Sequence, residues 1–458
     1  MRNWSTSAWK LGRQICLITW LTSVAITHTF AQAGTWSTKA AMPTARFGAA
    51  VAVVNSLVYV VGGCVSPVGN PVAILEVYDP KTDRWASGSP MPEPRCAGAA
   101  AVIDGLIYVA GGYSSVGPTG GRPPVHGIGV YDPRTDTWST KASIPTTRYG
   151  LAVAVVDGVL YAVGGLGSGT GSGRAVEAYN PASNTWTTKA PMPTAREGLA
   201  AGVVGGILFV TGGTGSPFPT TLDAYDPRSD AWATRGLIPT PRYSPAAGVI
   251  NGLIYVVGGA SGTRQQVEAY DPKTNTWVTE NPMPTGRSGL VAGVVDDVLY
   301  AVGGETLHSG PFSVNEAFDP FLRITIDIKP DDPDNTINLK SRGTVPVAIL
   351  GSATFDPTTV DPATVTLAGA PVVTRPNGVP MTSISDVNGD GYLDLLLHFR
   401  TQDLQLTRTS TEAVLYGETF SGQRIRGADA VRIVASDRLL RSNPWTEGPS
   451  GRRTLSTD

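Results

Sequence analysis

Residues 186–213 read WTTKAPMPTAREGLAAGVVGGILFVTGG, and close copies of this stretch recur in a fixed frame along most of the chain. Each copy opens on a tryptophan, carries an arginine ten residues later, and reaches a Gly-Gly pair 26 residues after the tryptophan. Only the segment between one pair and the next tryptophan varies in length, so insertions enter at one place in each unit. The tryptophans are Trp36, Trp85, Trp138, Trp186, Trp232 and Trp277.

Each unit has the pattern of four short β-strands. In the first unit, RFGAAVAVV and SLVYVVGG stand on either side of Asn55, which predicts a hairpin with a short turn. ILEVYDP and DRWAS follow as a third and a fourth strand around a Pro-Lys-Thr-Asp turn. A period of 45 to 53 residues is typical of units that bury their apolar faces by stacking on one another.

The glycine pairs, the spaced tryptophans, an aromatic residue three positions before each pair and the Tyr-Asp-Pro triplets together resemble the kelch family of β-propellers. This resemblance implies an all-β fold with a six-bladed kelch-type propeller over residues 34–320. The last unit lacks a closing tryptophan, and Trp36 has no strands before it. We therefore expect the strand around Trp36 to complete the sixth blade and close the ring.

The N-terminal residues have the pattern of an export signal. Three basic residues precede an apolar run at 15–26 and an Ala-Gln-Ala site at 31–33, which predicts a secretory signal over residues 1–33. A membrane anchor is the alternative, and no other stretch is long and apolar enough to span a bilayer. The mature chain is thus expected to be secreted or periplasmic, and its net charge of -2 argues against a nucleic-acid partner.

Two cysteines remain after the predicted cleavage, Cys64 after the first glycine pair and Cys96 after an arginine. The kelch resemblance places both at the mouth of the central channel, on adjacent blades. An oxidising compartment favours a disulfide between them, and two small buried thiols are the alternative.

The repeated arginines have two interpretations. The kelch resemblance puts them near the mouth, where a ring of arginines would attract an anionic ligand. The alternative is structural, because five units carry an acid two residues before the aromatic of their third strand, at a position suited to ion pairs inside the blades. The second unit has Gly129 there, which predicts an arginine left available. The arginines are Arg46, Arg95, Arg148, Arg196, Arg242 and Arg287.

Positions that differ between the repeats are the better candidates for a binding site, because variable aromatic and polar groups on a constant scaffold form a recognition surface. The longest insertion, which contains Arg122 and His126, is expected to overhang the mouth. We expect the mouth to bind a protein segment or a glycan. The candidates besides the arginines are Tyr113, Tyr149, Glu197, Tyr243 and Glu305.

Evidence for an enzyme is limited. Three histidines in the mature chain are too few for a copper site like that of the kelch-fold oxidases, and no nucleophile elbow, zinc motif or phosphate loop is present. The alternative function is a periplasmic kelch-type sugar epimerase or mutarotase, in which Glu197, Glu305 and Arg196 would move protons at a sugar carbon.

Residues 321–437 read as a second β domain, most simply a sandwich, followed by a polar tail at 438–458 that we expect to be disordered. This domain contains the loop SDVNGDGYLD at 385–394, in which oxygen ligands alternate as calcium requires. Leu397 stands where an EF-hand has its glutamate, so the loop looks more like an integrin-type calcium site or half a dockerin loop. An ordinary Asx-rich turn is the alternative. The candidate ligands are Asp386, Asn388, Asp390, Tyr392 and Asp394.

Overall fold

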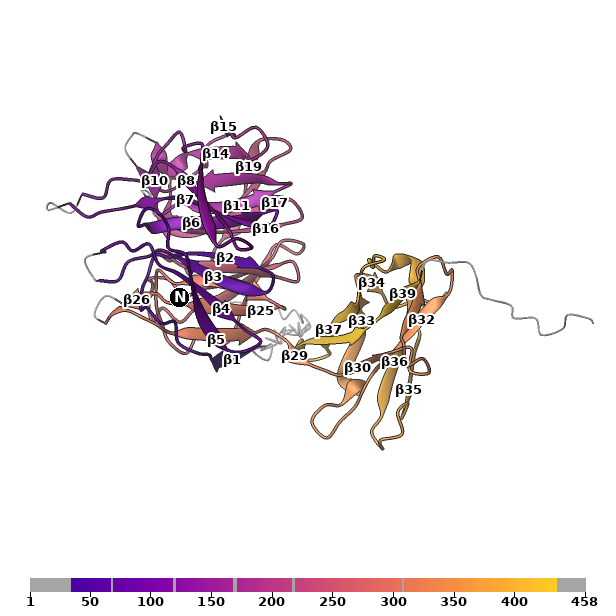
Figure 1. The fold of residues 1–458 in the computed structure, drawn as a ribbon. Coiled ribbons are helices and arrows are strands. Elements are labelled where there is room, and N and C mark those ends of the chain that lie inside the picture. The colour runs from indigo at the N-terminus through magenta and orange to yellow at the C-terminus, as the bar shows by residue number, and fades with distance from the viewer. Residues whose placement is uncertain are drawn as a thin grey trace, which may run out of the picture.

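A computed structural model describes residues 34–66, 69–117, 121–167, 171–215, 219–306 and 309–434. The predicted signal (1–33) and the polar tail (438–458) lie outside the described residues. The described chain folds into a ring of β-sheets followed by a smaller β module (Figure 1). No helix in this described part is long and apolar enough to cross a membrane.

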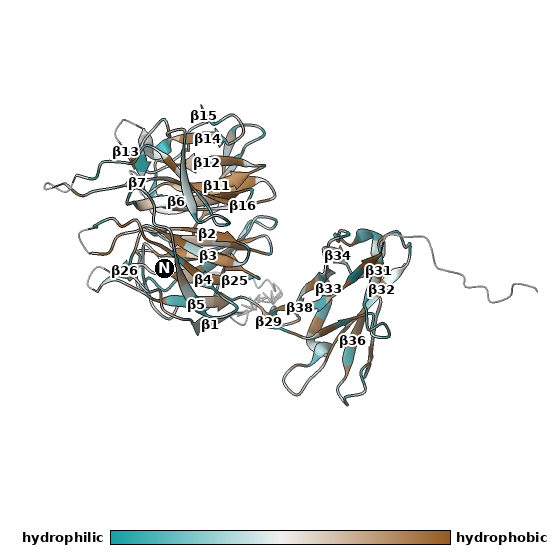
Figure 2. Cartoon of the chain, viewed as in Figure 1, coloured by the Kyte–Doolittle hydropathy of each residue, from teal (hydrophilic) through white to brown (hydrophobic). Residues whose placement is uncertain are grey.

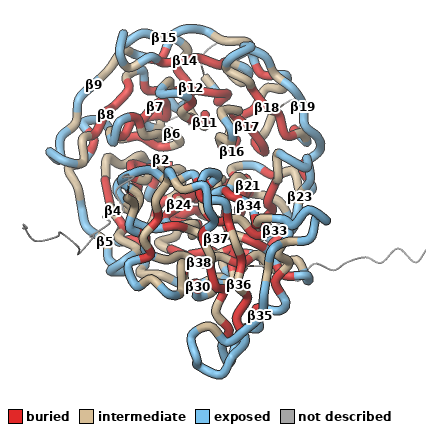
Figure 3. The backbone as a smooth tube through the Cα atoms, turned by 90° about the vertical axis from the view of Figure 1, so that its right-hand side faces the viewer, coloured by how far each residue is buried: buried red, intermediate tan, exposed pale blue. Residues whose placement is uncertain are grey.

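Within the described residues of the ring, six four-stranded antiparallel sheets stand around a central channel, and Figure 3 shows them nearly end on. From the channel outward, the first sheet consists of β2 (Ala50–Val54), β3 (Leu57–Val61), β4 (Leu75–Asp79) and β5 (Arg84–Gly88). The second consists of β6 (Cys96–Ile103), β7 (Leu106–Tyr113), β8 (Ile128–Asp132) and β9 (Thr137–Lys141). The third consists of β11 (Ala152–Val156), β12 (Val159–Val163), β14 (Val176–Asn180) and β15 (Thr185–Thr188). The fourth sheet consists of β16 (Glu197–Val204), β17 (Ile207–Thr214), β18 (Thr221–Asp226) and β19 (Ala231–Leu237). The fifth consists of β20 (Ala246–Ile250), β21 (Leu253–Val257), β22 (Val267–Asp271) and β23 (Thr276–Thr279). The sixth consists of β24 (Val291–Val295), β25 (Val298–Val302), β28 (Asn315–Asp319) and β1 (Thr35–Thr38).

Short turns join the two inner strands of each sheet, where the sequence predicted them. Asn55 has a φ of 51° and Ser56 a φ of 60°, the left-handed backbone that a two-residue hairpin turn requires. Asp104 and Asp157 occupy the same place in the next two sheets, with φ values of 51° and 49°. Asn, Asp and Gly recur here because they adopt this backbone at low cost.

The glycine pairs allow neighbouring sheets to approach closely. Gly62 has a φ of 64°, and a side chain at this position would place its Cβ 2.4 Å from the carbonyl oxygen of Arg95 in the next sheet. Gly63 has a φ of 104° and donates its amide to the same carbonyl at 2.7 Å. A larger residue at Gly62 would therefore push the two sheets apart.

The ring closes as the sequence predicted. Strand β1 pairs antiparallel with β28, and Trp36 lies opposite Phe318 with ring centroids 5.0 Å apart. The indole nitrogen of Trp36 donates at 3.0 Å to the carbonyl of Asn281, in the loop that follows the fifth sheet. The indole nitrogen of Trp85 donates in the same way to the carbonyl of Ala40 at 2.8 Å. The sheet that closes the ring is therefore bonded to its neighbour by the same hydrogen bond as a sheet inside the ring.

Apolar side chains fill the spaces between adjacent sheets. Figure 2 shows the apolar residues along β2, β3, β11 and β16. One such cluster joins the fifth and sixth sheets and contains Tyr255, Val257, Leu299 and Phe318. Because each unit contributes residues to clusters on both of its sides, no unit covers its own apolar faces alone.

The C-terminal module consists of two main sheets around one shared core, as expected for a sandwich-like domain. The first has the order β29 (Leu322–Arg323), β38 (Arg424–Ala430), β37 (Glu412–Thr419), β33 (Val360–Leu367) and β34 (Ala370–Pro371). The second has the order β30 (Ile326–Ile328), β32 (Thr344–Ile349), β36 (Asp394–Arg400) and β35 (Thr382–Ser385), and the short strands β31 (Thr336–Asn338) and β39 (Arg432–Val434) pair with each other.

The module contacts the propeller through polar side chains on β37 and β38. Tyr416 and Arg426 both donate to the carboxylate of Asp297, which lies in the turn between β24 and β25, at 2.6 and 2.7 Å. Arg424 forms an ion pair with Glu280, whose side chain is 1 % exposed. These contacts attach the module to one defined face of the ring.

Candidate functional site

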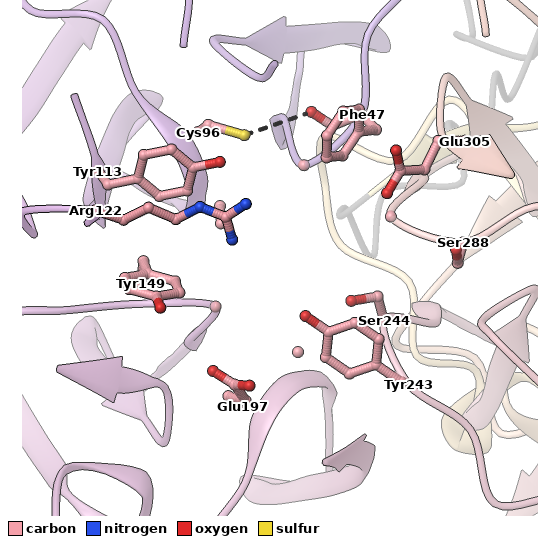
Figure 4. A pocket seen from close by; sticks show the side chains of 15 residues that line it. Phe47, Cys96, Tyr113, Arg122, Tyr149, Glu197, Tyr243, Ser244, Ser288 and Glu305 are labelled. Carbon is pink, nitrogen blue, oxygen red and sulfur yellow. Dashed lines mark hydrogen bonds between the residues drawn. The ribbon is translucent and has the colours of Figure 1, made fainter. Parts of the chain in front are cut away.

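The mouth of the channel holds a cavity of about 110 Å³, formed by residues that precede the inner strands or follow the glycine pairs (Figure 4). Ser288 stands before β24 and Asp297 after it, so the cavity and the C-terminal module lie at opposite ends of that strand. The mouth is thus left open by the module. Besides backbone glycines and alanine, the lining side chains are Phe47, Cys96, Tyr113, Arg122, Tyr149, Glu197, Tyr243, Ser244, Ser288 and Glu305.

Aromatic rings form one part of the wall. Tyr113 ends β7 and is 2 % exposed, and its ring meets that of Tyr149 edge to face at 5.4 Å. Tyr243, which is 40 % exposed, faces these rings across the cavity (Figure 4). The guanidinium of Arg122 lies over the Tyr113 ring at 5.1 Å from its centroid, a cation–π contact made by the predicted insertion.

Two carboxylates point into the cavity from opposite sides, Glu197 at the start of β16 and Glu305 in β26 (Glu305–Thr306), which pairs with β27 (Gly310–Pro311) (Figure 4). Partial burial raises the pKa of both carboxyl groups, and the positive charge of Arg122 opposes this rise. Each group therefore takes up a proton at a higher pH than an exposed glutamate does. When both carboxyl groups are ionised, they can accept hydrogen bonds from a ligand. When one is protonated and the other ionised, they can act as a general acid and a general base.

Five of the predicted mouth residues are brought together in this cavity: Tyr113, Tyr149, Glu197, Tyr243 and Glu305. Phe47 and Ser288, which occupy the register of Tyr149 in other repeats, also line the cavity, as does Arg122 of the overhanging insertion. Ser244 was missed. It follows Tyr243 in a register where four of the other repeats have glycine and the second has Ala97, and this departure was the available signal.

The arginines do not form the anion-attracting rim, and this candidate assignment is wrong. Five of them are at most 1 % exposed and point into their own sheets, where each pairs with the acid of its third strand. The guanidinium groups also donate hydrogen bonds to backbone carbonyls of the second strand, as Arg242 does to Val256 at 3.2 Å. The pairs are Arg46 with Glu76, Arg148 with Glu177, Arg196 with Asp223, Arg242 with Glu268 and Arg287 with Glu316.

The sequence predicted that Gly129 leaves one arginine without an acid, either Arg95 or Arg148. The structure pairs Arg148 with Glu177, so Arg95 is the exception. It is 7 % exposed and does not line the mouth cavity, so it is not available to a ligand there. Arg196, the proposed partner of Glu197 in proton transfer, is also removed from the mouth by its ion pair with Asp223 at 2.6 Å.

Cys64 and Cys96 are joined as a disulfide in the structure, with their Cα atoms 5.4 Å apart. The bond connects the first two sheets at the edge of the mouth and packs against Tyr113. It fixes the spacing of the two sheets at the point where the first aromatic wall residue stands.

The disulfide leads to a direct chemical prediction. Mass spectrometry of protein produced in an oxidising compartment, under non-reducing conditions, should recover Cys64 and Cys96 in one linked peptide. Because the two residues are 32 positions apart, reduction should lower the free energy of unfolding by roughly 3 to 4 kcal/mol. A Cys96→Ser variant should lose this response to reductant, and two freely alkylated thiols in the wild type produced there would contradict the assignment.

The acidic loop of the module folds around Asp386, whose carboxylate accepts the amides of Gly389 at 2.7 Å and Gly391 at 3.0 Å. Asp390 receives a hydrogen bond from the side-chain amide of Asn388 at 3.0 Å. Asp394 is fully buried, and its two oxygens accept the amides of Val387 and Gly351, both at 2.8 Å. Tyr392 lies on the exposed part of the loop.

Three of the predicted ligands, Asp386, Asn388 and Asp390, are thus exposed neighbours whose carboxylate and amide oxygens form a donor set that fits a hard cation. Both carboxylate oxygens of Asp394 already accept backbone amides at the base of the loop. No group of three or more His, Cys, Asp or Glu side chains converges as a ready metal site among the described residues.

The fold and its mouth define a kelch-type propeller, and two family models agree with this class. The model "Kelch motif" matches residues 45–92 and 94–145, and the "KLHDC2/KLHL20/DRC7 Kelch-repeats domain" matches residues 129–304. The chain therefore carries kelch repeats, as predicted.

Among individual proteins, the solved structure titled "Structure of YjhT" is similar to the chain at a TM-score of 0.53 and 18 % sequence identity. The match covers 61 % of this chain and 96 % of that one, and at this identity it shows a shared fold. No curated protein matched the sequence.

Proposed function

We propose that the chain is an exported recognition protein that binds the end of a glycan or a protein segment in the mouth of its propeller. The observation that carries this proposal is the cavity of about 110 Å³ in which aromatic rings, two glutamates and two serines from different repeats meet. Kelch propellers commonly bind proteins, and the repeats supply the rigid scaffold on which such a surface is built.

The size and chemistry of the cavity favour a glycan end over an extended peptide. The cavity is smaller than the range of about 300–1,000 Å³ usual for drug-sized ligands, so it admits a single group such as one sugar ring. Ionised carboxylates such as Glu197 accept two hydrogen bonds from adjacent hydroxyl groups, and Tyr149 offers a ring face for stacking. Peptide binding would use the wider rim outside the cavity.

A sugar epimerase or mutarotase remains the second candidate because Glu197 and Glu305 face one cavity and both have a raised pKa. Carboxyl groups with a raised pKa are suited to proton transfer because they hold and release a proton at a higher pH than an exposed glutamate does. NMR of a sugar panel distinguishes the two functions. An epimerase interconverts the sugar forms, whereas a recognition protein retains a sugar without changing the rate at which they interconvert.

Glycan and peptide arrays probed with residues 34–458 test the binding site. Glu197→Gln should weaken binding to the best ligand roughly ten- to hundredfold, because it removes a charged hydrogen-bond acceptor. Leu166→Ala is the matched control, since Leu166 is exposed on the same rim but does not line the cavity. Equal losses in both variants, or no change in either, would refute the mouth as the binding site.

The raised pKa values predict how binding depends on pH. If hydroxyl groups of the ligand donate to ionised Glu197 and Glu305, affinity is full above the raised pKa values and falls as the pH drops through them. The fall should begin at a higher pH than the usual glutamate pKa of about 4.3. Titrating the same ligand against Glu197→Gln/Glu305→Gln should give a flat profile over this range.

We also propose that the loop at 385–394 binds calcium through Asp386, Asn388, Asp390 and the carbonyl of Tyr392. The missing twelfth-position glutamate suggests a dissociation constant on the order of 0.1 to 1 mM, which is suited to an exported protein. Calorimetry should detect one site in the mature chain and none in Asp390→Ala. At calcium tenfold above the dissociation constant, the module should gain about 1.4 kcal/mol of stability, which chelator removes. Absence of both signals at millimolar calcium would leave the loop as a turn.

A further inference from the structure

The second sheet of the propeller encloses a cavity that no other part of the proposed function uses. It has a volume of about 140 Å³ and lies between Arg95 and the outer strand β9, away from the mouth. Its other polar side chains come from the outer strand and from Glu93. The lining residues are Met91, Pro92, Glu93, Arg95, Gly127, Gly129, Trp138, Ser139 and Thr140.

The cavity occupies the place of a carboxylate that the other sheets contain. Strand pairing shows that Gly129 lies opposite Thr140, in the register where an acid of the third strand lies opposite serine or threonine of the fourth. A Cβ on Gly129 would lie 3.3 Å from the Trp138 ring, so a side chain at this position needs only a small shift of the ring. The acids in this register are Glu76, Glu177, Asp223, Glu268 and Glu316, opposite Ser87, Thr188, Thr234, Thr279 and Thr38.

The missing acid leaves the guanidinium of Arg95 poorly satisfied. Its Nη1 donates to the carbonyls of Val109 and Gly111 at 3.4 Å each. The equivalent Arg148 donates to Gly164 at 2.6 Å and to Ala162 at 2.8 Å, in addition to its ion pair. Arg95 is nevertheless 93 % removed from solvent, since its exposure is 7 %. A buried cation with long hydrogen bonds calls for an anionic partner.

Glu93 only partly supplies that partner. It stands where the other five units have threonine, and one of its oxygens reaches Nη2 of Arg95 at 3.8 Å. Its side chain is 50 % exposed, whereas Glu76 in the first sheet is 4 % exposed and bonded directly to its arginine. Glu93 therefore lies at the entrance of the cavity and leaves the interior unfilled.

We propose that this cavity is a binding site for a small monocarboxylate, which pairs with Arg95 as the acids of the other five sheets pair with their arginines. The guanidinium presents parallel N–H donors that match a planar carboxylate, and Thr140, which carries a hydroxyl group, also lines the cavity. The volume exceeds that of a single water molecule, so an acetate-sized ligand fits. This site is independent of the ligand proposed for the mouth.

Acetate is the probe, titrated into the full mature protein with chloride of equal ionic strength as the reference. Calorimetry and thermal unfolding should show saturable binding with a dissociation constant on the order of millimolar, as expected for so small a ligand. Gly129→Glu restores the acid of the other sheets. It should abolish acetate binding and stabilise the protein in chloride, whereas acetate that stabilises this variant as much as wild type would overturn the proposal.

A second variant tests the part played by Glu93. Glu93→Thr introduces the residue of the other five units and removes the competing carboxylate. It should tighten acetate binding roughly two- to fivefold, the factor expected for losing one half-exposed charge contact. Weaker acetate binding in this variant would contradict the competing role of Glu93, and no saturable binding in wild type would show that Glu93 itself neutralises Arg95 and that the cavity holds only water.

Discussion

Removal of residues 34–41 should destabilise the propeller by roughly 3 to 5 kcal/mol, the cost of losing a large packed aromatic side chain. The deletion removes β1, which forms the outer strand of the sixth sheet and places Trp36 against Phe318. It also leaves the edge of β28 without its hydrogen-bonding partner, which further favours opening and aggregation. Thermal unfolding of the variant that begins at residue 42 measures the effect.

A deletion of equal length at the other end, residues 451–458, is the control, because the sequence places it in the polar tail. This second variant should unfold at the wild-type temperature. Trp36→Ala isolates the contribution of the side chain from that of the strand, and it should reproduce most of the loss. An unchanged unfolding transition in the residue-42 variant would contradict closure of the ring by β1.

Local repetition is why most of the fold could be predicted from the sequence. The turn at Asn55 and the close approach at Gly62 depend on backbone angles that few residues adopt, so these residues mark the same points in every unit. Closure could be predicted because Trp36 and the incomplete last unit lack complementary parts. The attachment of the module through Asp297 and Tyr416 could not, since nothing local relates these residues, which are 119 positions apart.

The candidate site was only partly predictable because its residues come from loops of different blades. Variable positions identified Glu197 and Glu305, yet the sequence did not show that they face one cavity. For the arginines, the acid at a constant register was the informative signal, and the direction of the side chain decided between rim and scaffold. The exchange at Glu93 and Gly129 was visible as two departures from the repeat, but their meeting at Arg95 required the structure.

Loss of one buried arginine should have an effect as large as loss of the closing strand. Arg242 is 1 % exposed and pairs with Glu268 at 2.6 Å, and Thr240 also donates to this carboxylate, at 2.7 Å. Arg242→Met leaves Glu268 buried without its cation, so the free energy of unfolding should fall by about 3 to 5 kcal/mol. Denaturant unfolding at neutral pH measures this loss.

Two further variants separate the ion pair from the packing of the side chain. Arg242→Met/Glu268→Leu removes both charges and should recover most of the stability, because the uncompensated carboxylate is gone. Arg95→Met applies the same change in the sheet that has Gly129 in place of the acid, and in chloride it should cost little or even stabilise. If Arg95→Met and Arg242→Met destabilise the protein equally, the arginines act through their apolar stems and carbonyl bonds, and the repeated acid contributes nothing specific.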